Sequence, residues 1–140
     1  MEQEIRERTK KKLAEHGVAA TSQRLDIGEV LFSAPQHLSA DQIIERLKAN
    51  ERNVSKATVY NTLNMFVQEG LLGTVHVDPE RTFYDSATGN HHHFYNVETK
   101  ELFDIPAELI ALGHMPALPE GTKADGVDVV IRVRRAAMSA

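Results

Sequence analysis

Four stretches in the first half of the chain are expected to be helical, the last three because their apolar residues recur at helical spacing. The first is a run of strong helix formers from residue 4 to 16, and each of the other three follows a residue that can cap a helix. These capping residues are Thr21 or Ser22, Ser39 and Ser55. The second helix is expected to end before Pro35 and the fourth at Gly70. The sequence therefore predicts four helices before residue 71.

Shorter segments with strand-like patterns follow the fourth helix. Residues 74–77 and 82–85 flank a turn and predict a hairpin, and residues 91–97 and 101–105 flank a second turn. Pro106 is expected to start a short helix through Leu112, residues 115–126 are expected to form a loop, and residues 127–134 alternate as a last strand.

The order of these elements predicts an α+β fold with two domains. Helices followed by a hairpin, in residues 1–85, are typical of a winged helix-turn-helix domain. Residues 86–140 would form a small α/β domain whose three-stranded sheet is too small to bury both faces. Two copies are therefore expected to join as a homodimer.

Composition narrows the class of protein. No apolar run approaches the roughly 20 residues needed to span a bilayer, and the first residues lack a secretory signal, which predicts a cytoplasmic protein with no membrane partner. The chain has no cysteine, which excludes disulfides, thiolate catalysis and cysteine zinc sites. The net charge is −4; residues 1–77 carry ten basic and ten acidic residues, and residues 78–140 carry six and ten. Nucleic-acid binding would therefore have to rest on a local surface.

The fourth helix offers such a surface opposite its apolar stripe of Val59, Leu63 and Phe66. The polar face presents hydroxyls, amides and one ammonium, which can contact base edges and phosphates. Its candidate residues are Ser55, Lys56, Thr58, Tyr60, Asn61 and Asn64. A small helical domain whose polar face is merely solvated fits the same pattern equally well.

Three consecutive histidines open the first strand of the second half. Side chains alternate along a strand, so His91 and His93 would share one face while His92 points to the other. If the following loop has two residues, antiparallel pairing places His93 opposite Asp104. Imidazoles beside a carboxylate suit a metal site, although a histidine run can also be a solvated strand end.

Several motifs, taken together, resemble the ferric uptake regulator (Fur) family over nearly the whole chain. They are Thr21-Ser22-Gln23-Arg24, His37-Leu38-Ser39-Ala40, Ala57-Thr58-Val59-Tyr60-Asn61-Thr62-Leu63, Glu69-Gly70-Leu71 and His91-His92-His93. Within the family, three segments resemble the iron response regulator (Irr) branch: residues 60–63, the proline-rich tail from Met115 to Gly121, and residues 127–132. The resemblance implies a dimeric, metal-responsive transcription factor that binds a double-stranded DNA operator.

The same resemblance implies a regulatory metal site and a set of DNA contacts. The metal ligands would be His37, Asp85, His91, His93 and Asp104. One Fe²⁺, Mn²⁺ or Zn²⁺ ion held by all five would join the two domains. The DNA contacts would be Ser55, Lys56, Thr58, Tyr60, Asn61, Arg24 and Lys12.

The chain also departs from the family pattern. Asn96-Val97-Glu98-Thr99 stands where most relatives have Cys-x-x-Cys, so their structural zinc site cannot form. A second histidine-rich site is reduced, because Asn90 and Ala111 replace expected ligands and His92 remains. In the Irr branch the cluster is associated with haem, and His92 would then supply an axial imidazole.

Three functions remain to be separated. The first is a regulator of iron homeostasis that responds to metal or haem. The second is a peroxide-sensing repressor of the same family, in which iron at the five-ligand site oxidises His37 or His91. The third, from another class, is a metal-dependent hydrolase; it is disfavoured because the sequence has no glycine-rich loop, nucleophile elbow or metalloprotease helix motif. We therefore do not expect an enzyme.

Overall fold

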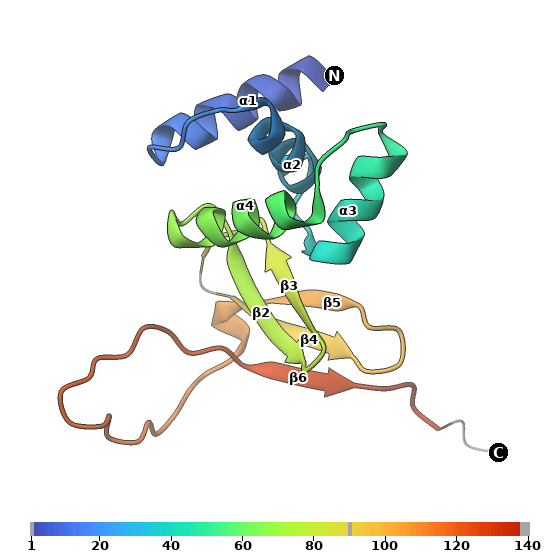
Figure 1. Cartoon of the computed structure of the whole chain (residues 1–140). Helices are drawn as coiled ribbons and strands as arrows, with labels where there is room; N and C mark the ends of the chain where they lie inside the picture. Colours follow the sequence, from blue (N-terminus) through green and yellow to red (C-terminus); the bar gives the residue numbers. More distant parts are fainter. Residues whose placement is uncertain (1, 90, 138–140) are drawn as a thin grey trace. The chain divides into compact units, whose positions relative to one another are not determined.

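The computed structural model describes residues 2–89 and 91–137 and divides into two compact units, residues 1–88 and 89–140 (Figure 1). The first unit has the helices and hairpin of a winged helix, and the second is a small strand-rich unit, so the predicted α+β fold class is confirmed. The expected second domain, residues 86–140, includes positions 90 and 138–140, which lie outside the described residues. The prediction that Asn90 replaces a ligand falls on one of these positions.

The described part of the first unit contains four helices, and the predicted caps begin three of them. The helices are α1 (Glu2–Glu15), α2 (Ser22–Phe32), α3 (Ala40–Ala49) and α4 (Lys56–Gln68). Thr21 caps α2, and Ser55 caps α4 by accepting a hydrogen bond from the Thr58 amide. Ser39 forms both hydrogen bonds of a capping box with Gln42 at the start of α3. Each cap satisfies amides that have no partner inside the helix.

The apolar stripes of these helices meet in one core. Val59, Leu63 and Phe66 of α4 are fully buried, as the sequence predicted. They pack with residues of the other helices and of the strands, including Leu13, Ile27, Leu31, Ile43, Leu47 and Leu71. The polar face of α4 is therefore the face left to solvent.

Helices α1 and α2 approach each other closely at Gly28. A Cβ atom at this position would lie 2.4 Å from the Cγ2 atom of buried Thr9. Beside this contact, Arg6 of α1 donates hydrogen bonds to the carboxylates of Asp26 (3.1 Å) and Glu29 (3.0 Å) of α2. The bond to Glu29 raises the pKa of Arg6, although partial burial opposes the shift. Close packing and a bridging guanidinium together hold α1 on α2.

A three-stranded antiparallel sheet completes the first unit. Its strands are β1 (His37–Ser39), β2 (Gly73–Asp78) and β3 (Arg81–Asp85), in the order β1-β3-β2. The predicted hairpin is confirmed, with Asp78 paired to Arg81 across the turn. Strand β1 was not predicted, because three residues are too few to show a periodic pattern and it forms only by pairing with β3.

The second unit is built on a mixed three-stranded sheet. Its strands are β4 (His91–Asn96), β5 (Leu102–Pro106) and β6 (Val130–Val133), in the order β5-β4-β6. Strand β4 pairs antiparallel with β5, which confirms that His93 lies opposite Asp104. Strand β6 is shorter than predicted and runs parallel to β4.

The predicted helix from Pro106 to Leu112 is wrong. Pro106 is the last residue of β5, and only Ala107–Leu109 form a single 3₁₀ turn (η1). Leu109 and Leu112 are exposed, so no buried surface stabilises further turns. The chain then runs to β6 without regular structure, as an open loop (Figure 1).

One face of this sheet carries a row of exposed apolar side chains. Phe94 of β4 pairs with Phe103 of β5 and with Ile131 of β6. The three side chains are 38%, 50% and 41% exposed. We call Phe94, Phe103 and Ile131 the apolar row.

Among the described residues, no helix is both long and apolar enough to cross a membrane.

Candidate functional site

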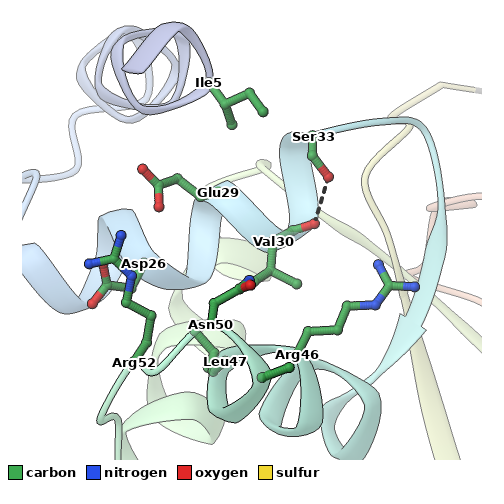
Figure 2. Close-up of a pocket in the computed structure, with 10 residues that line it drawn as sticks. Ile5, Asp26, Glu29, Val30, Ser33, Arg46, Leu47, Asn50 and Arg52 are labelled. Carbon is green, nitrogen blue, oxygen red and sulfur yellow. Dashed lines mark hydrogen bonds and ion pairs between the residues drawn. The ribbon is translucent and has the colours of Figure 1, made fainter. Parts of the chain in front are cut away.

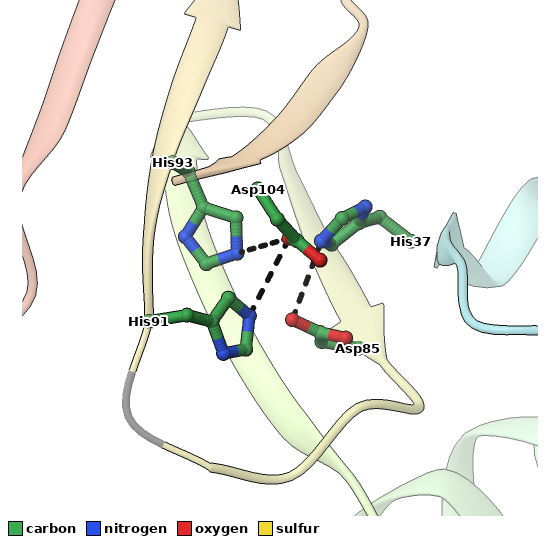
Figure 3. A group of neighbouring side chains, drawn as sticks. All are labelled: His37, Asp85, His91, His93 and Asp104. Carbon is green, nitrogen blue, oxygen red and sulfur yellow. Dashed lines mark ion pairs between the residues drawn. The ribbon is translucent and has the colours of Figure 1, made fainter. Parts of the chain in front are cut away.

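The first unit brings His37 and Asp85 together. His37 opens β1 and pairs with Asp85, the last residue of β3. The Nε2 atom of His37 lies 3.3 Å from the Oδ2 atom of Asp85, and both side chains are largely buried (Figure 3). The pair follows from the strand β1 that the sequence pattern did not reveal.

Two neighbouring residues, Gln36 and Ser86, hold this pair in place. The Gln36 amide donates to the Ser86 hydroxyl at 3.1 Å, and the Ser86 amide donates to the Gln36 carbonyl at 3.2 Å. The second carboxylate oxygen of Asp85 accepts a hydrogen bond from the Ala87 amide at 2.9 Å. The sequence did not reveal a role for Gln36 and Ser86, because neither residue belongs to a recognisable motif. Their hydrogen bonds join the two chain segments beside His37 and Asp85.

The second unit brings His91, His93 and Asp104 together. The Nε2 atoms of His91 and His93 lie 3.5 and 3.4 Å from the same carboxylate oxygen of Asp104 (Figure 3). The two imidazole rings stand edge to face with centroids 4.7 Å apart. Within each of the two groups, the potential ligand atoms lie within 4.8 Å of one another. The predicted alternation of the histidines along β4 is confirmed.

The hydrogen bond of His91 reveals how its ring is protonated. Its Nδ1 atom lies 2.9 Å from the carbonyl oxygen of Gly89, which can only accept, so Nδ1 carries a hydrogen. In the neutral ring, Nε2 then presents a lone pair to a carboxylate oxygen of Asp104. This lone pair and the Asp104 oxygen, 3.5 Å apart, can then both bind one cation. The donor set of imidazoles and carboxylates therefore fits a divalent metal ion.

His92 lies on the other face of β4 in a different environment. Its Nδ1 atom accepts a hydrogen bond from the Val129 amide at 3.0 Å, and the side chain is 7% exposed. The neutral ring then carries its hydrogen on Nε2. One nitrogen is already bonded and the other is protonated, so axial ligation of haem would require the Val129 hydrogen bond to break.

The polar face of α4 is presented to solvent as predicted. Lys56, Tyr60 and Asn61 are exposed, and α4 contains no acidic residue. The Ser55 hydroxyl also donates to the Thr58 hydroxyl at 2.8 Å, so these two candidates form the cap. The amides at this helix end and the ammonium beside them favour an anionic group such as phosphate.

A groove of about 550 Å³ separates Tyr60 from the β2–β3 hairpin. Its walls include Asp41, Asp78 and Glu80, whose carboxylates disfavour phosphate, together with the guanidinium of Arg81, which attracts it. Tyr84 also lines the groove, where burial raises the pKa of its hydroxyl and negative charge on Tyr60 adds to the shift. Carboxylates outnumber the one guanidinium of this groove, so the start of α4 is electrostatically the more favourable place for a polyanion.

The two remaining candidates for DNA contact, Arg24 and Lys12, make contacts with other residues of the first unit. Arg24 donates a hydrogen bond to the Ala19 carbonyl at 3.0 Å. The Lys12 ammonium lies 4.4 Å from the centre of the Phe32 ring, and Phe32 packs against Phe66 on the buried face of α4. Lys12 is therefore held on the side of α4 opposite its polar face.

The chain is similar in sequence and in structure to known metal and peroxide regulators. A family model described as the ferric uptake regulator family matches residues 15–125. The chain is 32% identical over 112 residues to the ferric uptake regulation protein of Pseudomonas fluorescens, covering 78% of this chain and 91% of that protein. It is 37% identical over 108 residues to the peroxide operon regulator of Bacillus subtilis, covering 77% and 69%. The ferric uptake regulator of Pseudomonas aeruginosa with manganese superposes with a TM-score of 0.68 at 25% identity, covering 89% and 96%.

Proposed function

This chain belongs to the ferric uptake regulator family, and on that premise we propose that it is a dimeric DNA-binding transcription regulator of iron homeostasis. Residues 1–85 would bind DNA, and residues 86–140 would dimerise and take part in sensing. Two clusters of imidazoles and carboxylates carry the proposal. In one, His37 lies beside Asp85. In the other, His91 and His93 both lie beside Asp104. Such a regulator acts in the cytoplasm and has no enzymatic activity.

A divalent ion would be held by His37, Asp85, His91, His93 and Asp104. Binding of one ion by ligands from both units would couple metal binding to the DNA-binding unit. A coupling of about 1–3 kcal/mol would change DNA affinity roughly 5- to 150-fold. Fe²⁺, Mn²⁺ and Zn²⁺ all suit this donor set, and the structure of the regulator from P. aeruginosa is one with manganese.

Elemental analysis and Mn²⁺ titration of the full chain test the metal site. We expect about one ion per subunit, and Asp104→Asn should weaken binding because Asp104 is the carboxylate shared by two histidines. Asp125→Asn is the matched control, because Asp125 lies in the exposed loop before β6. Equal Mn²⁺ affinity of wild type and Asp104→Asn would refute the assignment.

We propose that α4 reads the operator through Tyr60 and Asn61, while Ser55, Lys56 and Thr58 contact phosphate. Arg24 and Lys12 would contribute more distant basic charge. Asn61→Ala should cost about 1–3 kcal/mol of operator binding, or about 5- to 150-fold, if its amide contacts a base edge. Fluorescence anisotropy with labelled operator at several salt concentrations measures this loss. Gln68→Ala, at the exposed end of the same helix, should bind like wild type; an equal loss in both variants would count against base reading.

The apolar row supports dimer formation through the second unit. A mixed sheet with Phe94, Phe103 and Ile131 exposed on one face leaves apolar surface that a second copy can bury. Phe103→Lys should shift the sedimentation equilibrium toward monomer. Leu109→Lys, an exposed apolar residue outside the row, should leave the equilibrium unchanged. A dimer that is equally stable in both variants would place the contact elsewhere.

The finer proposal is membership of the Irr branch, with haem as the signal. It is supported by the resemblance of residues 60–63, 115–121 and 127–132 to that branch and by the missing Cys-x-x-Cys. The relatives described above, in contrast, are named as ferric uptake and peroxide regulators. Haem titration followed by absorption spectroscopy tests it. His92→Ala should abolish the spectrum of a histidine-ligated haem, and an unchanged spectrum would exclude His92 as the ligand.

The second candidate function is peroxide sensing, which the similarity to the B. subtilis peroxide operon regulator favours. In this case hydrogen peroxide with Fe²⁺ would add oxygen to His37 or His91. Mass spectrometry of the Fe²⁺-loaded protein after peroxide detects the added mass, and the Mn²⁺-loaded protein is the control. Unmodified histidines in both samples would exclude this function.

A further inference from the structure

A pocket in the first unit lies apart from the histidines and from the polar face of α4. It has a volume of about 460 Å³ and lies among α1, α2, α3 and the segment that follows α3 (Figure 2). Its apolar lining comes from Ile5, Val30 and Leu47. Val30 and Leu47 also belong to the core, so this lining is held rigidly.

Charges at one end of the pocket are balanced within the protein. The guanidinium of Arg6 forms ion pairs with the carboxylates of Asp26 and Glu29, at 3.1 and 3.0 Å. The guanidinium of Arg52 lies 3.8 Å from the Asp26 carboxylate. Two carboxylates therefore face two guanidinium groups. A charged ligand of either sign would have to break one of these ion pairs to bind at this end.

The other end of the pocket carries one positive charge without a carboxylate. Arg46 donates a hydrogen bond to the neutral side-chain oxygen of Gln36 at 2.8 Å, and this is the contact that the described residues provide for its guanidinium. In Figure 2, the Arg46 guanidinium lies at the end of the pocket away from Asp26 and Arg52. The planar group has further N–H donors in the geometry that a carboxylate accepts.

We propose that this pocket binds a small organic monoanion, with its apolar body over Val30 and Leu47 and its carboxylate on Arg46. One negative charge neutralises the charge that the pocket leaves unbalanced, and the rigid apolar lining selects a compact aromatic or aliphatic body. Gln36 hydrogen-bonds to Val30 and Leu31 as well as to Arg46, so a ligand on Arg46 would be detected at the end of α2. The proposed site needs neither metal nor DNA.

Three compounds of one shape and different charge test the proposal on the full chain. Benzoate carries the proposed charge, benzamide is its neutral analogue, and benzamidine is its cationic analogue. Binding is measured by titration with two-dimensional NMR, and we expect saturation by about 10 mM because a ligand of this size has few contacts. Benzoate should bind about 5-fold or more tightly than benzamide and should shift the signals of the Arg46 and Gln36 side chains. Equal affinity for benzamide, tighter binding of benzamidine, or no saturation would overturn the proposal.

Variants locate the charge that recognises the ligand. Arg46→Gln should weaken benzoate binding about 5- to 10-fold and leave benzamide unaffected. Lys48→Gln, which removes one exposed positive charge from the same helix outside the pocket, should bind benzoate like wild type. Equal losses in both variants would refute a role for Arg46. If Arg46→Gln does not fold, the comparison of the three compounds on the wild-type protein still tests whether the pocket prefers an anion.

Discussion

The contact between Gly28 and Thr9 allows a stability change to be worked out from geometry. In Gly28→Ala, the new Cβ atom would lie 2.4 Å from the Thr9 Cγ2 atom, where ordinary contacts begin at 3.4 Å. The difference of 3.4 − 2.4 = 1.0 Å must come from movement of α1 or of Thr9. Thr9 is fully buried and its hydroxyl donates to the Ile5 carbonyl at 2.8 Å, so it cannot turn away cheaply.

Two opposing effects set the expected magnitude. Overpacking of this kind costs about 1–3 kcal/mol, and replacing glycine by alanine within a helix gains about 1 kcal/mol. Gly28→Ala should therefore lower the free energy of unfolding by up to about 2 kcal/mol. Thr9→Ser removes the clashing methyl group and keeps the hydroxyl. In that background Gly28→Ala should stabilise by up to about 1 kcal/mol.

Urea denaturation of the four proteins in this cycle measures the coupling directly. The sign of the Gly28→Ala effect should reverse between the wild-type and the Thr9→Ser backgrounds, which no general effect of alanine on helix stability can produce. The same sign and size in both backgrounds would refute the close approach of α1 to α2. Circular dichroism confirms that helix content is unchanged in each variant.

Three further predictions concern side chains of the first unit. Arg6→Met should lower the free energy of unfolding by about 1 kcal/mol, more at low than at high salt, because it removes the guanidinium that Asp26 and Glu29 share. A loss independent of salt would indicate packing instead. The pKa of Tyr84 is raised above 10.0, chiefly by burial, so its contribution to stability is fully present below pH 10.0 and is lost as pH rises through the higher folded value. Tyr60→Phe should lower that pKa only slightly in an ultraviolet titration, and a return to the ordinary value would contradict burial as the main cause. Lys12→Met should cost about 0.5–1 kcal/mol of stability through its aromatic contact, whereas the exposed control Lys10→Met should cost less in the same denaturation assay.

The helical part of the fold was predictable because capping residues and apolar spacing act locally. Ser39 and Ser55 begin their helices as expected, and the α4 stripe is buried. The pairing of His93 with Asp104 was also predictable, since antiparallel register follows from counting residues across a turn.

What the sequence did not reveal depends on contacts between distant segments. Strand β1 exists because β3 pairs with it, and so the approach of His37 to Asp85 had no local signal. The helix expected after Pro106 fails for the opposite reason: its local pattern is favourable, but Leu109 finds nothing to pack against. The hydrogen bond between His92 and Val129 likewise depends on β6 lying parallel to β4.

The alternation of side chains along β4 places two different groups on opposite faces of one strand. His91 and His93 point to Asp104, while Phe94 belongs to the apolar row on the reverse face. Insertion or deletion of a single residue within β4 would exchange the two faces, so it would displace the histidines and the apolar row together. Substitution, in contrast, can alter either face alone. Over evolution, then, the length of this strand should tolerate far less change than the identity of its residues, and a designer could alter the histidine face without changing the apolar row.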